Sequence, residues 1–203
     1  MDVLSAIKQR RSIREFRENA SVCGKDVNTL INAARWAPSA RNLQPLEYVI
    51  VKDDETRGGI AEAARQPQPR EVPVCLVVLG DLKRAGLVGQ VSPHEVTTSD
   101  KGRRMFLYMD AAAAIENMLL TAEYLGFNSL WISSFDEERV CELVQAPKRF
   151  TPLAIICVGK KTDKTVSPPP KRPKEDIVHY GGWSAKKPDE SYIGFSKKIN
   201  PPS

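Results

Sequence analysis

The stretch RRSIR near the N-terminus gathers Arg10, Arg11, Ser12 and Arg14. Guanidinium groups hold their donors in a plane, which suits phosphate and the carbonyl or nitrogen edge of a flat ring. The Ser12 hydroxyl adds a further donor. Arg10 and Arg14 are four residues apart, so they share a face if a helix continues that far. A solvated basic surface is the alternative interpretation of this stretch taken alone.

The stretch WAPSARNLQP, residues 36–45, is a second candidate for chemistry. Pro38 ends the preceding helical pattern. Asn42 and Gln44 carry amides that both donate and accept hydrogen bonds, which matches the edge of a flat heterocyclic ring. Polar groups tucked beside an apolar strand need partners, because burying them unpaired costs free energy. A purely structural turn is the alternative.

Apolar spacing and capping residues predict the elements that position these two stretches. Helices are predicted over residues 2–10, 25–36, 53–65, 100–125 and 136–145, with Asp2 and Asp136 as N-caps and Gly126 ending the long helix. Strands are predicted over residues 47–52, 72–81, 128–135 and 152–160. Because helices and strands mix without regular βαβ repetition, the order favours an α+β fold.

The long predicted helix is apolar on nearly every side in its middle, DAAAAIENMLLTA. A helix that is apolar all round must be buried on all sides. In a chain of 203 residues, this predicts packing against a partner subunit as well as against its own sheet. A core helix in a monomer is the alternative.

Composition narrows the function classes. Cys23, Cys75, Cys141 and Cys157 form no CxxC pair, and the two histidines lie far apart in sequence, so we expect no metal site. The net charge of +5 is spread along the chain without an aromatic platform. We therefore expect an anionic cofactor and substrates rather than nucleic acid.

The hydropathy of the chain argues against a membrane segment. No run approaches the roughly 18 uncharged apolar residues of a membrane helix, and the N-terminus lacks the pattern of a secretory signal. We expect a cytoplasmic protein without membrane association.

Three blocks together resemble the nitroreductase family: RRSIREF, AARWAPSARNLQPLEYVIV and MDAAAAIENMLLTAEYLGFNSLWISSF. With PLAIICVGK and the basic stretch after PPP, the likeness covers about residues 1–180 in the right order. It implies an α+β fold, with a central mixed or antiparallel sheet flanked by helices, in an intertwined homodimer that binds FMN at the subunit interface. We expect residues 1–180 to form the FMN-binding domain and residues 181–203 a C-terminal extension, loose or packed on the partner.

The resemblance also implies roles for particular positions. Phosphate and pyrimidine ligands from one chain match the arginine stretch, and a loop from the other chain lies along the flavin. An amide near the ring matches Gln66, and Ile132 and Ser133 match the segment facing the reactive N5 edge. Ser133 and Ser134 depart from the Glu-Gly or Gly-Gly frequent in the family. Either Lys171 or Arg172 matches a terminal phosphate ligand. The expected site residues are Arg10, Arg11, Ser12, Arg14, Pro38, Ser39, Ala40, Asn42, Gln66, Ile132, Ser133, Lys171 and Arg172.

The reaction implied by the resemblance is hydride transfer from NADH or NADPH, through FMN, to a nitroaromatic, quinone, enone or flavin in a ping-pong cycle. The flavin carries this chemistry, so no catalytic side chain is required. Same-fold alternatives are a reductive dehalogenase or a flavin-fragmenting enzyme, and a further alternative is a non-catalytic flavin-binding protein.

Overall fold

The computed structural model describes residues 1–18, 20–89, 99–164 and 166–183. The chain divides into two compact units, Met1–Val166 and Ser167–Ser203. In the described part of the second unit, a single 3-10 turn, η3 (Lys174–Asp176), is followed by the stacked rings of His179 and Trp183, whose centroids lie 4.2 Å apart. The boundary predicted at residue 180 stays a prediction.

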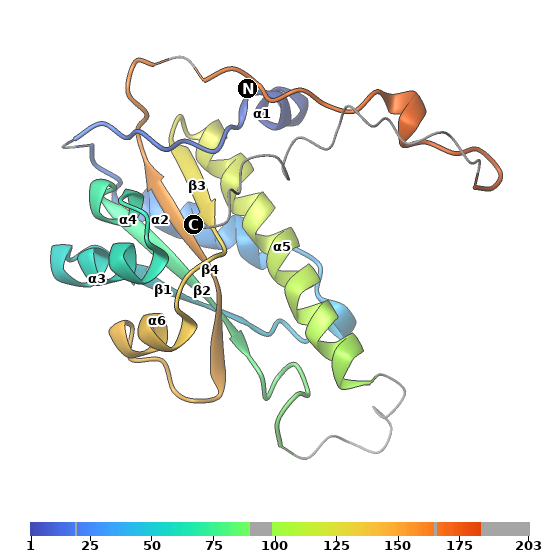
Figure 1. Ribbon diagram of the computed structural model, residues 1–203, viewed down its shortest axis with the longest axis horizontal. Coiled ribbons are helices and arrows are strands. Elements are labelled where there is room, and N and C mark those ends of the chain that lie inside the picture. Colours follow the sequence, from blue (N-terminus) through green and yellow to red (C-terminus); the bar gives the residue numbers. More distant parts are fainter. Residues whose placement is uncertain (19, 90–98, 165, 184–203) are drawn as a thin grey trace, which may run out of the picture. The chain divides into compact units, whose positions relative to one another are not determined.

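A four-stranded antiparallel sheet forms the centre of the first unit (Figure 1). Its strands are β1 (Leu46–Val51), β2 (Val74–Asp81), β3 (Asn128–Ile132) and β4 (Phe150–Gly159), in the order β1-β2-β4-β3. Every residue of β2 is buried, because helices cover both faces of the sheet. The expected α+β architecture is confirmed, and the sheet is antiparallel rather than mixed.

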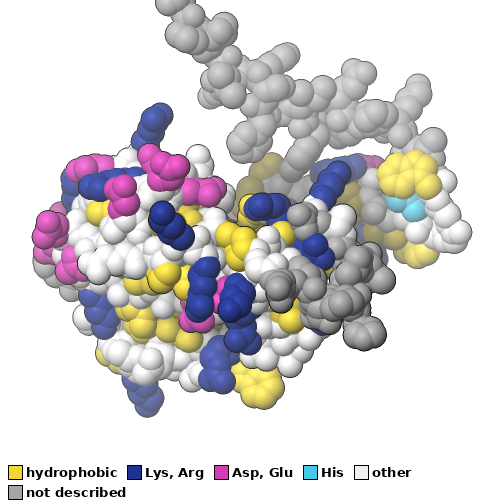
Figure 2. Space-filling model, turned by 90° about the horizontal axis from the view of Figure 1, so that it is seen from below, with side chains coloured by type: hydrophobic (Ala, Val, Ile, Leu, Met, Phe, Trp, Pro, Cys, Tyr) yellow, Lys and Arg dark blue, Asp and Glu magenta, His cyan; other side chains and the backbone are white. Residues whose placement is uncertain are grey.

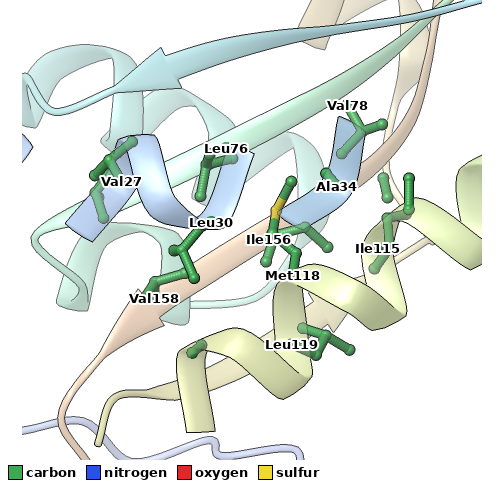
Figure 3. Packing of buried hydrophobic residues seen from close by; sticks show 14 of the residues in the cluster. Val27, Leu30, Ala34, Leu76, Val78, Ile115, Met118, Leu119, Ile156 and Val158 are labelled. Atoms are coloured by element: carbon green, nitrogen blue, oxygen red, sulfur yellow. The ribbon is translucent and has the colours of Figure 1, made fainter. Parts of the chain in front are cut away.

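One face of the sheet packs against α2 (Gly24–Arg35) and α5 (Asp100–Tyr124). Figure 3 shows this core, where Leu30 of α2 lies near Val158 and Met118 of α5 lies near Ile156, both on β4. Leu30 is completely buried, and Met118 and Ile156 are each 1% exposed. Such apolar burial, at roughly 25 cal/mol per Å², is what holds the two helices on the sheet.

The opposite face is covered by α3 (Asp54–Ala64) and α6 (Glu137–Leu143), as Figure 1 shows. The short helix α4 (Gln68–Glu71) follows α3 and leads into β2. Ile60 of α3 and Val140 of α6 are fully buried in this second core. Ile13 and Phe16 join the same core from the segment after α1 (Val3–Gln9).

The predicted elements and caps are present, with shifted boundaries. The side chains of Asp2 and Asp136 accept from backbone N–H groups in the first turns of α1 and α6, as expected of N-caps. Strand β3 ends at Ile132 rather than 135. Strand β4 begins at Phe150 rather than 152, and its Pro152 faces Leu79 at a register shift, where a residue without an N–H is tolerated.

Helix α5 is fully buried along one side within a single chain. Leu107, Ala111, Ala114 and Met118 are buried, and the other side exposes a second set of large side chains. In the middle of the helix, residues 110–122, every residue is buried or half-buried, and the exposed residues lie nearer its two ends. The predicted packing of this middle against a partner subunit stays a prediction. The large exposed side chains of α5 are Met105, Phe106, Tyr108, Met109 and Tyr124.

Candidate functional site

The arginine segment is extended and lies against the end of the sheet. The Ile13 N–H donates to the Ser129 carbonyl at 3.0 Å, and Ser12 forms a parallel bridge with Ser129. Because Ile13 points into the core, Ser12 and Arg14 on either side of it are exposed. Helix α1 ends at Gln9, so the helical face that Arg10 and Arg14 were expected to share does not exist.

Arg10 and Arg11 are half-buried at the start of this segment. The Arg10 Nε lies 3.4 Å from the Glu116 Oε1 on α5, and an Nη of Arg11 donates to the Arg10 carbonyl at 2.7 Å. Neither Nε makes a hydrogen bond within the described part of the chain, although both atoms are buried. Burial raises the pKa of the nearby Glu123 carboxyl, while Lys161, Arg10 and Arg11 lower it, so this corner carries several positive charges.

Gln68 on α4 is a candidate that the sequence did not single out. Its Nε2 donates to the Arg14 carbonyl at 3.2 Å, and its Oε1 is buried without a hydrogen-bond partner among the described residues. Gln66, the predicted amide, lies two residues earlier and is half-buried, with its backbone N–H bonded to the Ala61 carbonyl. The sequence QPQP interrupts any periodicity, so it contains no signal that distinguishes the two amides.

The predicted loop is a tight polar turn built around η1 (Ala40–Asn42). Arg41, Asn42 and Gln44 have φ angles of 52°, 56° and 49°, in the left-handed region. The Ser39 Oγ accepts from the Gln44 N–H at 3.0 Å, and the Gln44 Nε2 lies 3.2 Å from the Asn42 Oδ1. Pro38, Asn42 and Gln44 are exposed, while Ser39 and Ala40 are half-buried. The amides thus support the turn and still reach solvent.

The strand end predicted to face the flavin lies at the close of β3. Ile132 is buried and pairs with Ile155, and Ser133 directly after it is exposed. Since Ser129 in the same strand holds the arginine segment, both regions are attached to β3. The remaining two predicted residues, Lys171 and Arg172, belong to the second unit, where an Nη of Arg172 donates to the Asp176 carbonyl at 3.1 Å.

Helix α5 contacts both candidate segments, at different turns. Glu116 pairs with Arg10, and Asp110 accepts from the Ala40 N–H. Six residues separate the two acids, which at about 100° per residue places them roughly 120° apart around the helix. The arginine segment and the loop therefore meet different sides of α5 within one chain.

The family model described as "Nitroreductase family" matches residues 7–160, a range that includes both candidate segments. The chain belongs to the nitroreductase family. A curated relative, the NADPH-dependent oxidoreductase of Staphylococcus saprophyticus, is 26% identical over 190 residues, covering 91% of this chain and 75% of its own. The expected membership in this family of oxidoreductases is confirmed.

Solved structures of nitroreductase type have the same fold. The Nitroreductase Family Protein from Streptococcus pneumoniae superposes with a TM-score of 0.73 at 26% identity, covering 88% of this chain and 99% of its own. A structure from Staphylococcus epidermidis, described as a candidate NAD(P)H:FMN oxidoreductase, reaches 0.77 at 22% identity, covering 88% and 95%. The second likeness, at that identity, supports the fold alone.

The surface of this nitroreductase-family chain is mixed in charge. On the face seen in Figure 2, Lys and Arg side chains lie scattered among acidic and apolar ones. No group of three or more His, Cys, Asp and Glu capable of holding a metal ion occurs among the described residues. Within the same ranges, no helix is both long and apolar enough to cross a membrane.

Proposed function

We propose that this chain is an FMN-dependent oxidoreductase that moves hydride from NADH or NADPH to a small acceptor, acting as a homodimer. The observation that carries the proposal is one cluster at the end of the sheet. Gln68 donates to the carbonyl of exposed Arg14, and its buried Oε1 has no hydrogen-bond partner among the described residues. Exposed Ser12 and half-buried Arg11 precede Arg14 in the same extended segment. Such an arrangement suits a flat anionic ligand.

The residues present fit FMN by the chemistry of their donors and acceptors. FMN has an anionic phosphate, which matches planar guanidinium donors and the Ser12 hydroxyl. Its pyrimidine edge carries donors and acceptors, which match a side-chain amide. A buried polar atom without a partner costs free energy, so the Gln68 Oε1 and the Arg11 Nε would gain from a ligand that pairs with them.

Bound FMN would supply the redox chemistry, accepting hydride at N5 and passing it on. The protein would then bind the FMN, orient it and stabilise its reduced form. The cations of Arg10 and Arg14 would favour negative charge on the reduced ring system. Pro38, Ser39, Ala40 and Asn42 of the partner would lie along the ring, with Ile132 and Ser133 at its reactive edge. One of Lys171 and Arg172 would hold the phosphate, and Gln66 stays a further candidate for the ring.

The homodimer is proposed from the unpartnered side of α5 and its surroundings. A groove of about 610 Å³ between α1, α2 and α5 is lined mostly by apolar side chains, among them Val3, Trp36, Leu120 and Tyr124. Trp36 is 88% exposed and Tyr124 62% exposed in one chain. An exposed apolar surface of this kind marks an interaction site. A second copy would also bring the loop of one chain to the arginine segment of the other.

Steady-state kinetics test the proposed reaction. Protein purified with its flavin is mixed with NADH or NADPH and a nitroaromatic or a quinone, and nucleotide oxidation is followed. Parallel lines in double-reciprocal plots are expected, because donor and acceptor use the same site in turn. Bound FMN without nucleotide oxidation would instead indicate a flavin carrier or a same-fold enzyme with another reaction. Colourless protein that ignores added FMN would refute the proposal.

A further inference from the structure

The loop of residues 39–44 has a backbone that its own sequence does not favour. Arg41 and Gln44 adopt left-handed φ angles, which their side chains disfavour, whereas Asn42 is of a residue type that tolerates this region. Such conformations persist only where the surroundings impose them. The loop therefore needs anchors outside itself, and two charged side chains supply them.

Asp110 anchors the beginning of the turn. Its two carboxylate oxygens lie 3.0 and 3.2 Å from the Ala40 N, whose N–H they accept. The carboxylate comes from α5, 70 residues away in sequence, and the residue is 8% exposed. Burial raises the pKa of this carboxyl, and the bond from Ala40 opposes that shift. A buried acid of this kind is held in place by a backbone group of the loop.

Arg84 anchors the end of the same turn. Its Nε donates to the Leu43 carbonyl at 3.1 Å. Arg84 itself is positioned by the buried Asp81, whose Oδ1 accepts from the Lys83 and Arg84 N–H groups at 2.9 and 3.2 Å. Asp110 and Arg84 line one cavity of about 460 Å³ together with Pro38, Ser39 and Tyr48.

Asp110 and Arg84 pair with opposite ends of the turn, one with an N–H group and the other with a carbonyl. The Ala40 N–H at the start of the turn needs an acceptor and the Leu43 carbonyl at its end needs a donor, and a carboxylate and a guanidinium supply these. Asp110 and Arg84 occupy these two places. We propose that Asp110 and Arg84 are positioning residues, which fix residues 39–44 in the shape that contacts the flavin of the partner chain. This inference rests on the proposed function, and neither side chain is assigned to the chemistry.

Limited proteolysis of flavin-free protein tests the positioning directly. Trypsin cleaves after Arg41, an exposed residue inside the loop, and mass spectrometry reports that one cut. Asp110→Ala should raise its rate about tenfold, the loss expected for one hydrogen bond to a charged group. Asp110→Asn, which keeps an acceptor oxygen, should restore slow cleavage. Arg84→Ala should also raise the rate, and it alters an exposed side chain, so it tests the idea even if Asp110→Ala fails to fold.

Titration of FMN into the same stripped proteins supplies the second readout. Asp110→Ala should raise the Kd for FMN about tenfold, whereas Asp53→Ala should leave it unchanged. Asp53 is the matched control, since it accepts a backbone N–H from Thr56 at 2.8 Å at the start of α3, and strand β1 separates it from the loop. Wild-type protein that binds no FMN would end the proposed function. Wild-type binding with unchanged cleavage and unchanged Kd in both Asp110→Ala and Arg84→Ala would overturn the positioning role alone.

Discussion

Ile13 donates its backbone N–H to the carbonyl of Ser129 at 3.0 Å, and this one bond ties the arginine segment to the strand that ends at Ile132. The bond joins residues more than a hundred positions apart. It directs the Ile13 side chain into the core and leaves its neighbours Ser12 and Arg14 outside. A ligand bound to these side chains would therefore lie beside β3.

Removing the guanidinium of Arg14 should weaken FMN binding. Arg14→Ala loses one charge-assisted hydrogen bond, worth about 1.5–3 kcal/mol, and the Kd for FMN should rise accordingly. Arg17→Ala is the matched control, because Arg17 is an exposed arginine of the same segment that pairs with Asp163. Fluorescence titration of stripped protein measures both. Equal affinity in wild type and Arg14→Ala would remove Arg14 from the site.

Gln66 and Gln68 are rival candidates for the amide that contacts the flavin ring, and substitutions distinguish them. If the buried amide of Gln68 serves the flavin, Gln68→Met should raise the Kd for FMN more than Gln66→Met does. Gln68→Met should also lower the free energy of unfolding by about 1 kcal/mol, because the bond to the Arg14 carbonyl is lost. Chemical denaturation and FMN titration give the two numbers. A larger effect from Gln66→Met would return the role to Gln66.

The unpartnered side of α5 should form the dimer interface. Ala113→Lys places a charge where close helix approach is expected, so the dimer should dissociate in sedimentation velocity. Asn28→Lys, at an exposed position of α2, is the control and should leave the assembly unchanged. An Ala113→Lys protein that sediments as the wild type does would refute this placement of the interface.

Tyr48, which lines the same cavity as Asp110 and Arg84, should make the stability of the protein depend on pH in the alkaline range. Burial, with a smaller contribution from Glu47, raises the pKa of Tyr48 to about 12 from the usual 10.0. The folded state thus keeps its phenol proton longer than the unfolded chain does. Its contribution to stability is complete below pH 10 and is lost as the pH rises toward 12. At pH 11 the loss is at most about 1.4 kcal/mol.

Tyr48→Phe isolates this effect. Urea denaturation of both proteins between pH 9 and pH 12 should show a shallower fall in stability for the variant, because phenylalanine has no proton to lose. Parallel curves over that range would contradict the raised pKa.

Much of the fold could be predicted, because capping residues and apolar runs along the sequence determine where its helices and strands form. Asp2 and Asp136 cap helices where the sequence placed them, and the continuous apolar run of β2 is buried throughout. The error at the arginine segment has a physical cause. Helical spacing between Arg10 and Arg14 is a local pattern, but the bond from Ile13 to Ser129 is a distant contact that extends the chain after Gln9.

Residues of the candidate site could be proposed from the sequence only where a family motif includes them. The family resemblance singled out the arginine segment and the loop, and the family model that matches residues 7–160 confirms the family. No motif singled out Asp110, Arg84 or Gln68, because their hydrogen-bond partners lie 70, 41 and 54 positions away in sequence. The roles proposed for them rest on tertiary contacts, which spacing along the chain does not encode.

Anaerobic reduction of the FMN-loaded protein tests the central claim most directly. NADH and NADPH are added separately in the absence of oxygen, and the blue absorbance band of the bound flavin is recorded. We predict that at least one nucleotide bleaches the band and that a nitroaromatic or quinone then restores it. Protein that holds no FMN, or a band that neither nucleotide alters, would contradict the account.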